Sequence, residues 1–125
     1  MAGGLLKKIA TQKGINVEVH TAGLAHCANT PATAKAIAVM QDIGIDISDE
    51  YSKPVTAEAL EWADMIVPIQ RNHGAHLLED YPQLEPKIHF LDYDVHDPYN
   101  GSMSDYCERR DQLELLLSRL SLQPE

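Results

Sequence analysis

The chain has 125 residues, of which 44% are hydrophobic and 23% charged, and its formal net charge is −9 at pH 7. This length and composition are typical of one soluble globular domain, which we expect to span residues 1–125. An acidic surface repels nucleic acid and anionic lipid, and no apolar run approaches the length that spans a bilayer. We therefore expect neither nucleic acid nor a membrane as a partner. Residues 1–8 have too short an apolar part for a signal peptide, and the two cysteines, Cys27 and Cys107, form no CxxC pair. These features predict free thiols in a reducing cytoplasm.

The first half of the chain predicts two helices around an extended segment. Residues 2–13 show helical spacing of leucine and isoleucine and end at Gly14, which predicts a helix. Residues 16–21 alternate polar and apolar side chains, as a half-buried strand does. A Thr-Pro pair at 30–31 is typical of a helix start, and helical spacing then continues to Gly44.

The second half predicts two further strands and three helices. A short helix begins at Thr56, and the apolar run 65–69 has the length of a buried parallel strand. A helix is predicted over residues 71–79 and a strand over residues 87–91. Ser102, with an acidic residue three positions later, is typical of a capping box that opens the last helix.

The order of these elements is helix, strand, helix, helix, strand, helix, strand, helix. Alternation of this kind predicts an α/β fold with a parallel sheet and helices on both of its faces. In such folds ligands bind beyond the carboxyl ends of the strands. Asp97 lies just past the end of the last predicted strand, where an active-site residue is expected.

Asp97 and Pro98 stand in a loop that also contains Tyr99 and Gly101. Proline fixes its own φ and drives the preceding residue toward extended geometry, so the Asp97 carboxyl projects from a stiff loop. A carboxyl held in this way suits a general acid, which must reach the leaving group of a substrate. The alternative is an ordinary turn, because Asp-Pro and Asn-Gly pairs are common in loops.

Several short motifs occur along the chain in a characteristic order. They are Met1-Ala2 with Leu5; His20-Thr21-Ala22-Gly23; Pro31 with Ala34 and Ala36; Gly44-Ile45-Asp46-Ile47-Ser48 with Ser52 and Thr56; Ala63-Asp64-Met65-Ile66-Val67; and Asp97-Pro98-Tyr99 with Gly101 and Tyr106. In this order and spacing they resemble the low-molecular-weight protein tyrosine phosphatases, including the protein-arginine phosphatase branch. The resemblance extends over almost the whole chain.

This resemblance implies a three-layer α/β fold with flavodoxin-like strand order. It also implies hydrolysis of phosphomonoesters or phosphoramidates through a cysteine nucleophile, with no cofactor and no metal. The substrate would be a phosphorylated protein or a small phosphate ester, and phosphotyrosine and phosphoarginine both stay open. By the resemblance Asp97 is the general acid, Tyr99 lines the substrate pocket, and Thr21 stands where a serine hydroxyl supports the phosphate loop. Near Glu50 the family usually has histidine, so Glu50 departs from the pattern.

The family's Cys-x5-Arg-Ser-Pro motif, which precedes the first helix, does not occur in the 125 residues. In the family its thiolate attacks phosphorus while the arginine and a nest of backbone N–H groups hold the oxygens. Cys27 has Thr33 at the position of the arginine, and Cys107 falls within a predicted helix. The resemblance therefore implies an N-terminally truncated domain that lacks its first and central strand and is inactive alone. Strand edges exposed by such a gap are expected to promote self-association.

Two other functions stay open from the sequence. The chain could be a non-catalytic pseudophosphatase or regulatory module, or a relative of the arsenate reductases. The latter chemistry needs paired redox cysteines, which Cys27 and Cys107 do not obviously provide. A metal site at His73 and His76, three residues apart, is not expected, because zinc needs three or four convergent ligands.

Overall fold

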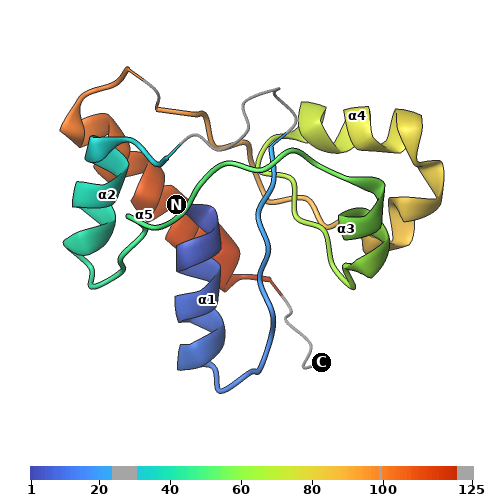
Figure 1. Cartoon of the computed structure of the whole chain (residues 1–125), viewed down its shortest axis with the longest axis horizontal. Helices are drawn as coiled ribbons and strands as arrows, with labels where there is room; N and C mark the ends of the chain where they lie inside the picture. The colour runs from blue at the N-terminus through green and yellow to red at the C-terminus, as the bar shows by residue number, and fades with distance from the viewer. Residues whose placement is uncertain (24–30, 99, 121–125) are drawn as a thin grey trace.

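A computed structural model of the chain describes residues 1–23, 31–98 and 100–120. These residues form five α-helices and one 3₁₀ helix, in the order shown in Figure 1. The elements are α1 (Ala2–Gln12), α2 (Ala34–Gln41), α3 (Ala57–Trp62), α4 (Arg71–Asp80), η1 (Pro82–Lys87) and α5 (Met103–Ser118).

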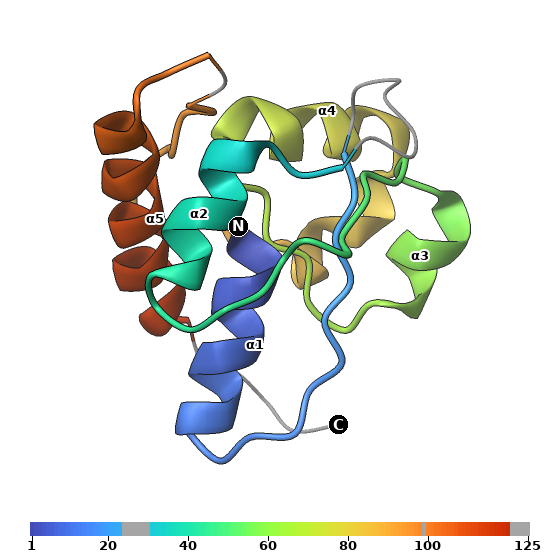
Figure 2. The same ribbon diagram turned by 60° about the vertical axis from the view of Figure 1, so that its left-hand side comes forward.

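The helices gather in two groups, with extended segments between them (Figure 1). In the first group α1 and α2 both pack on α5, which the rotated view in Figure 2 also shows. Its core is the larger one, and its most deeply buried side chains are Leu5, Val39, Met40, Ile47, Leu116 and Leu117. In the second group α4 contacts η1, and a smaller core formed by Leu60, Leu77 and Leu84 joins them to α3. The extended chain thus lies between two apolar clusters.

Most of the predicted helices are confirmed, and their ends follow local signals. Gly14 and Gly44 adopt φ of +69° and +80° just after α1 and α2, a conformation that favours glycine. The Thr56 hydroxyl accepts a hydrogen bond from the Ala59 N–H (3.1 Å) and opens α3. Ser102 and Asp105 form the predicted reciprocal capping box at the start of α5.

The start of α2 differs from the prediction at residues 30–31. Thr33, with extended backbone, caps the helix by accepting a hydrogen bond from the Ala36 N–H (3.2 Å). Pro31 lies before the helix and forms an isolated antiparallel bridge with Tyr51, while Thr30 lies outside the described residues. The predicted start at Pro31 was therefore wrong, because the threonine nearer the helix supplies the cap.

The predicted strands at residues 16–21, 65–69 and 87–91 do not form a ladder in the described part of the chain. Of the three isolated bridges that the described residues form, only the parallel bridge of Ile66 with Ile88 joins two predicted strands; the others, Gly23 with Pro54 and Pro31 with Tyr51, lie outside them. Residues 16–20 keep the predicted alternation, with Val17 and Val19 less exposed than their neighbours. Residues 16–22 nevertheless make no backbone–backbone hydrogen bond to a described residue. Alternation reports which face is buried, whereas a strand also needs a paired neighbour about 4.8 Å away. The three-layer sheet therefore stays a prediction for this chain.

The helices are also short. None of those that the structure describes combines the length and apolar character needed to cross a lipid bilayer.

Candidate functional site

The first turn of α1 is the place where the sequence-predicted residues come closest together. A Cβ atom built on Gly3 would clash with the side-chain methyl of Thr21 and would lie 3.9 Å from Oε1 of Glu50. Both side chains therefore face the same turn of the helix. Glycine, which has no Cβ atom, is the residue that leaves room for the Thr21 methyl against position 3.

Asp97 reaches the same region from the other half of the chain. The segment before it is fixed by two hydrogen bonds: the Val95 N–H donates to the Ile69 carbonyl (3.2 Å), and Nε2 of Gln70 donates to the Val95 carbonyl (3.3 Å). Val95 itself is buried in the larger core. Asp97, two residues later, is exposed, so its carboxyl is carried on an anchored backbone and stays accessible.

The pKa of the Met1 α-amino group depends on the carboxylates that lie near the start of α1. Burial lowers the pKa of this group below its usual value of 8.0, while the charges of Glu50 and then Asp97 act in the opposite direction and raise it. Two carboxylates from distant parts of the sequence therefore lie within electrostatic reach of the start of α1. The positive end of the helix dipole adds to the field at this point.

The start of a helix is a general site for anions, because its first N–H groups have no partner within the helix. Met1 provides no side-chain cap for α1. The site thus combines N–H donors that suit phosphoryl oxygens with a nearby accessible carboxyl, Asp97. A carboxylate repels a phosphate, but its protonated form donates a hydrogen bond, so this geometry suits a proton donor beside a bound phosphoryl group.

The structure brings together two of the three predicted site residues, Asp97 and Thr21, around one helix start. The third, Tyr99, lies outside the described residues, as does Cys27. Cys107 lies in α5, as predicted, and is a half-buried free thiol. The sequence assigned no role to Gly3. Two adjacent glycines in the first turn of a helix were the available signal, since glycine weakens a helix unless close packing requires it.

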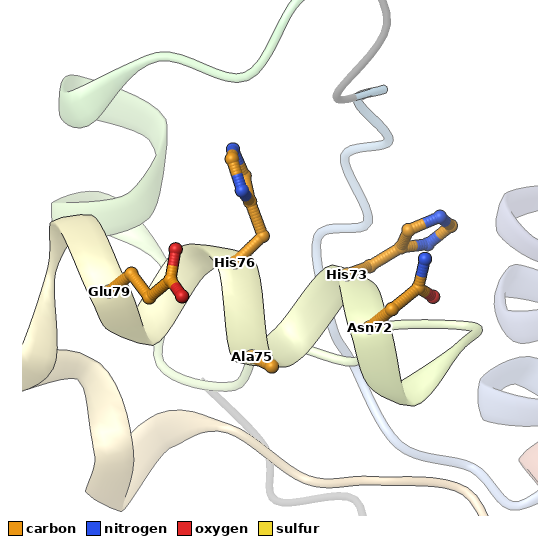
Figure 3. Close-up of a pocket in the computed structure, with 5 residues that line it drawn as sticks. All are labelled: Asn72, His73, Ala75, His76 and Glu79. Atoms are coloured by element: carbon orange, nitrogen blue, oxygen red, sulfur yellow. The ribbon is translucent and has the colours of Figure 1, made fainter.

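The histidine pair His73 and His76 lies apart from this site, on the outer face of α4. Figure 3 shows it beside a shallow pocket lined by Asn72, His73, Ala75, His76 and Glu79. The two imidazoles leave successive turns of the helix and do not converge on Glu79 (Figure 3). Among the residues that the structure describes, no three His, Cys, Asp or Glu side chains form a group that could hold a metal ion.

Comparison with known proteins gives a consistent result. The sequence profile of the family described as low molecular weight phosphotyrosine protein phosphatase matches residues 1–123. The protein-arginine-phosphatase of Bacillus subtilis (strain 168) is 33% identical over 130 residues, an alignment that covers 98% of this chain and 86% of the relative. The low molecular weight protein-tyrosine-phosphatase Ptp of Acinetobacter johnsonii is 30% identical over 112 residues, covering 86% and 76% of the two chains.

Solved structures of this family have the same fold. A crystal structure of a YwlE mutant from Bacillus subtilis superposes with a TM-score of 0.86 at 31% identity, covering 94% of this chain and 83% of that one. The low molecular weight protein tyrosine phosphatase from T. tengcongensis gives a TM-score of 0.86 at 29% identity, with coverage of 93% and 84%. The fold is therefore the α/β fold of these enzymes, and the chain belongs to the low-molecular-weight protein tyrosine phosphatase family.

Proposed function

We propose that this chain carries the acid-donating part of a phosphatase active site, with Asp97 as the general acid. The observation that supports the proposal is the proximity of Asp97 to the start of α1, where its charge raises the pKa of the Met1 α-amino group. In the proposed reaction a cysteine thiolate attacks phosphorus and the bond to the leaving group breaks. Asp97 gives its proton to the departing oxygen of an ester or to the departing nitrogen of a phosphoramidate.

The nucleophile is the part of this chemistry that the 125 residues do not supply. They contain no Cys-x5-Arg motif, and Cys107 is built into α5. The low thiol pKa that such a reaction needs comes from a positive nest at a helix N-terminus, which a cysteine inside a helix does not have. We therefore propose that the 125-residue chain by itself is inactive and becomes a phosphatase when a strand and a Cys-x5-Arg-Ser-Pro loop precede Met1.

The proposed substrates are phosphorylated proteins or small phosphate esters in the reducing cytoplasm. Thr21 is proposed to support the phosphate loop, since its side chain packs on the first turn of α1. Tyr99 is proposed to line the substrate pocket, on the family resemblance alone. Relatives named for both phosphoarginine and phosphotyrosine hydrolysis are about equally similar to this chain. Phosphoarginine and phosphotyrosine should therefore both be assayed as substrates.

The experiment compares the 125-residue chain with a restored chain that carries the strand and loop in front of Met1. Aryl phosphates of graded leaving-group pKa, phosphotyrosine and phosphoarginine are the substrates. We expect turnover only in the restored chain. There Asp97→Asn should lower kcat by roughly 10²–10⁴ for poor leaving groups and by much less for good ones, which need no proton.

Asp92→Asn is the matched control, because Asp92 is an exposed carboxylate of the same segment that pairs with Arg119 (2.7 Å). This variant should leave kcat unchanged. If Asp97→Asn lowered kcat by the same factor for all leaving groups, Asp97 would be a residue of the turn and not the general acid. Turnover of about 1 s⁻¹ or more by the 125-residue chain, abolished in Asp97→Asn, would show that the nucleophile is already present.

A non-catalytic role for the 125 residues is the second candidate, and the missing Cys-x5-Arg motif favours it. In that role the extended backbone of residues 16–22, which has no backbone partner among the described residues, would pair with another chain. We propose self-association of the isolated chain on this basis. A restored chain that folds stably yet never turns over any of these substrates would favour the non-catalytic role.

A further inference from the structure

Pro98, which follows Asp97, is joined to Gly101 by a backbone hydrogen bond. The Gly101 N–H donates to the Pro98 carbonyl (2.6 Å), and Asn100 between them has a φ of +65°. A Cβ atom at position 101 would lie 2.6 Å from the Pro98 carbonyl oxygen and 2.8 Å from Oδ2 of Asp105. The turn therefore requires glycine at position 101 and is enclosed on one side by the first turn of α5.

A lysine from another helix holds the outside of this turn. Nζ of Lys35, in the first turn of α2, donates a hydrogen bond to the Gly101 carbonyl (2.5 Å). Two residues earlier, the Thr33 hydroxyl donates to the hydroxyl of Tyr106 (3.2 Å), a residue that is only 4% exposed. Since α2 also packs on α5, the start of α2 contacts the turn at Gly101 and the beginning of α5 at Tyr106.

The positive charge of Lys35 lies near the carboxylate of Asp105. The pKa of Asp105 is lowered first by the hydrogen bonds from the Ser102 backbone and side chain, and further by the charges of Arg109 and Lys35. Lys35 thus neutralises part of the negative charge at the start of α5 while its hydrogen bond goes to the turn. No other lysine in the described residues donates to the loop between Asp97 and α5.

We infer that Lys35 is a positioning residue for Asp97: its hydrogen bond to the Gly101 carbonyl holds Gly101 against Pro98, so that the Asp97 carboxyl faces the start of α1. This inference rests on the proposed role of Asp97. It adds a residue of α2 that does not touch the reacting groups but sets where the acid stands. Removing the hydrogen bond should let the turn relax and carry Asp97 away from α1.

The test uses the 125-residue chain with a free α-amino group and compares Lys35→Met with Lys7→Met. Methionine keeps a long side chain and good helix propensity, and Lys7 is an exposed helical lysine whose ammonium bonds to no described residue. Loss of one hydrogen bond should speed amide hydrogen exchange at Gly101 roughly threefold to tenfold in Lys35→Met. Lys7→Met should leave this rate unchanged.

The pKa of the Met1 α-amino group, followed by NMR titration, then reports the position of Asp97. Removing the positive charge of Lys35 would by itself raise this pKa, because one repulsive charge is lost. Displacement of Asp97 lowers it, because Asp97 raises it in the folded chain. We expect a lower pKa in Lys35→Met, no further drop when Asp97→Asn is added to it, and the original value in Lys35→Arg.

An unchanged or higher α-amino pKa in Lys35→Met, or an unchanged Gly101 exchange rate, would overturn the assignment. A general loss of structure is recognised by faster exchange throughout α5, which Lys35→Arg would not share. Turnover does not enter these measurements. Failure of Asp97 as an acid in the restored chain would therefore be seen separately from failure of Lys35 to position it.

Discussion

The imidazole of His20 stacks on the indole of Trp62, with ring centroids 4.3 Å apart and planes inclined by 22°. Nε2 of the same imidazole lies 3.0 Å from Oε1 of Glu18, two residues earlier in the extended segment. The stack joins the segment at residues 16–22, which has no backbone partner in the described chain, to the last residue of α3. It therefore fixes the neighbouring Thr21 relative to the rest of the fold.

We expect a double-mutant cycle of His20→Ala and Trp62→Leu to give a coupling free energy of about 0.5 kcal/mol, the lower end of the range for aromatic pairs. The low value follows from exposure, since Trp62 is 46% exposed. Urea unfolding of the four proteins measures it. His89→Ala, at an exposed histidine in no described ring contact, is the control. Strictly additive effects of the two variants would mean that the stack does not hold the segment.

The buried α-amino group of Met1 predicts a dependence of stability on pH. Its pKa is lowered in the folded chain from 8.0, so between the folded value and 8.0 the unfolded chain binds more protons. Stability should therefore rise as pH increases through this window and level off above it. Acetylation of the α-amino group should remove this rise, and Glu50→Gln should widen the window, because Glu50 raises the folded pKa. A rise in stability with pH that persists after acetylation would be caused by other titrating groups.

The lowered pKa of Asp105 predicts that the chain loses stability in acid. Its folded pKa is lowered from 3.8, mainly by the hydrogen bonds from Ser102, so its contribution to stability is present above the unfolded value. The contribution is lost as pH falls through the folded pKa. Asp105→Asn should be less stable than the parent at neutral pH, and the difference should shrink toward about pH 2. Glu108→Gln, an exposed position of the same helix, should show no such convergence, and a constant difference in Asp105→Asn would contradict the assignment.

The backbone of residues 16–22 forms no backbone hydrogen bond to the part of the chain that the structure describes, which predicts association between copies of the chain. Sedimentation of the 125-residue chain should show dimers or larger species at micromolar concentration. Val19→Lys should reduce them, since a charge on an open edge opposes pairing. A peptide carrying the first strand of the family should compete and raise the melting temperature.

Leu115→Lys tests a different surface, because Leu115 is 48% exposed on α5. It should leave association unchanged if pairing occurs through residues 16–22. A chain that stays monomeric at all concentrations and ignores the peptide would show that the extended segment does not act as an open edge.

The features that could be predicted from the sequence are those with local causes. The capping box at Ser102 and Asp105 and the cap at Thr56 lie within three residues of the groups they bind. The alternation at residues 16–21 correctly indicated which side chains are less exposed. Pairing of that segment could not be predicted in the same way, because a ladder depends on a neighbour that alternation does not reveal.

The features that escaped prediction depend on distant parts of the chain. The hydrogen bond from Lys35 to Gly101 spans 66 residues, and nothing in the sequence near Lys35 distinguishes it from a solvated surface lysine. The role of Asp97 as a general acid was predicted from its proline and from the family resemblance, and it stays a proposal. That its charge reaches Met1 became evident only from the folded chain.

The close approach of Thr21 to Gly3 has a consequence for protein engineering. Replacing helical glycines by alanine is a common route to thermostability, since alanine favours a helix by roughly 1 kcal/mol. In α1 that route is closed at Gly3 by the Thr21 methyl, and at Gly4 an added Cβ would lie 3.0 Å from Cγ2 of Ile45 and 3.3 Å from Cγ2 of Ile47. Attempts to stabilise this scaffold should therefore begin outside the first turn of α1. In that turn the two glycines lower the helix propensity but allow neighbouring side chains to pack closely.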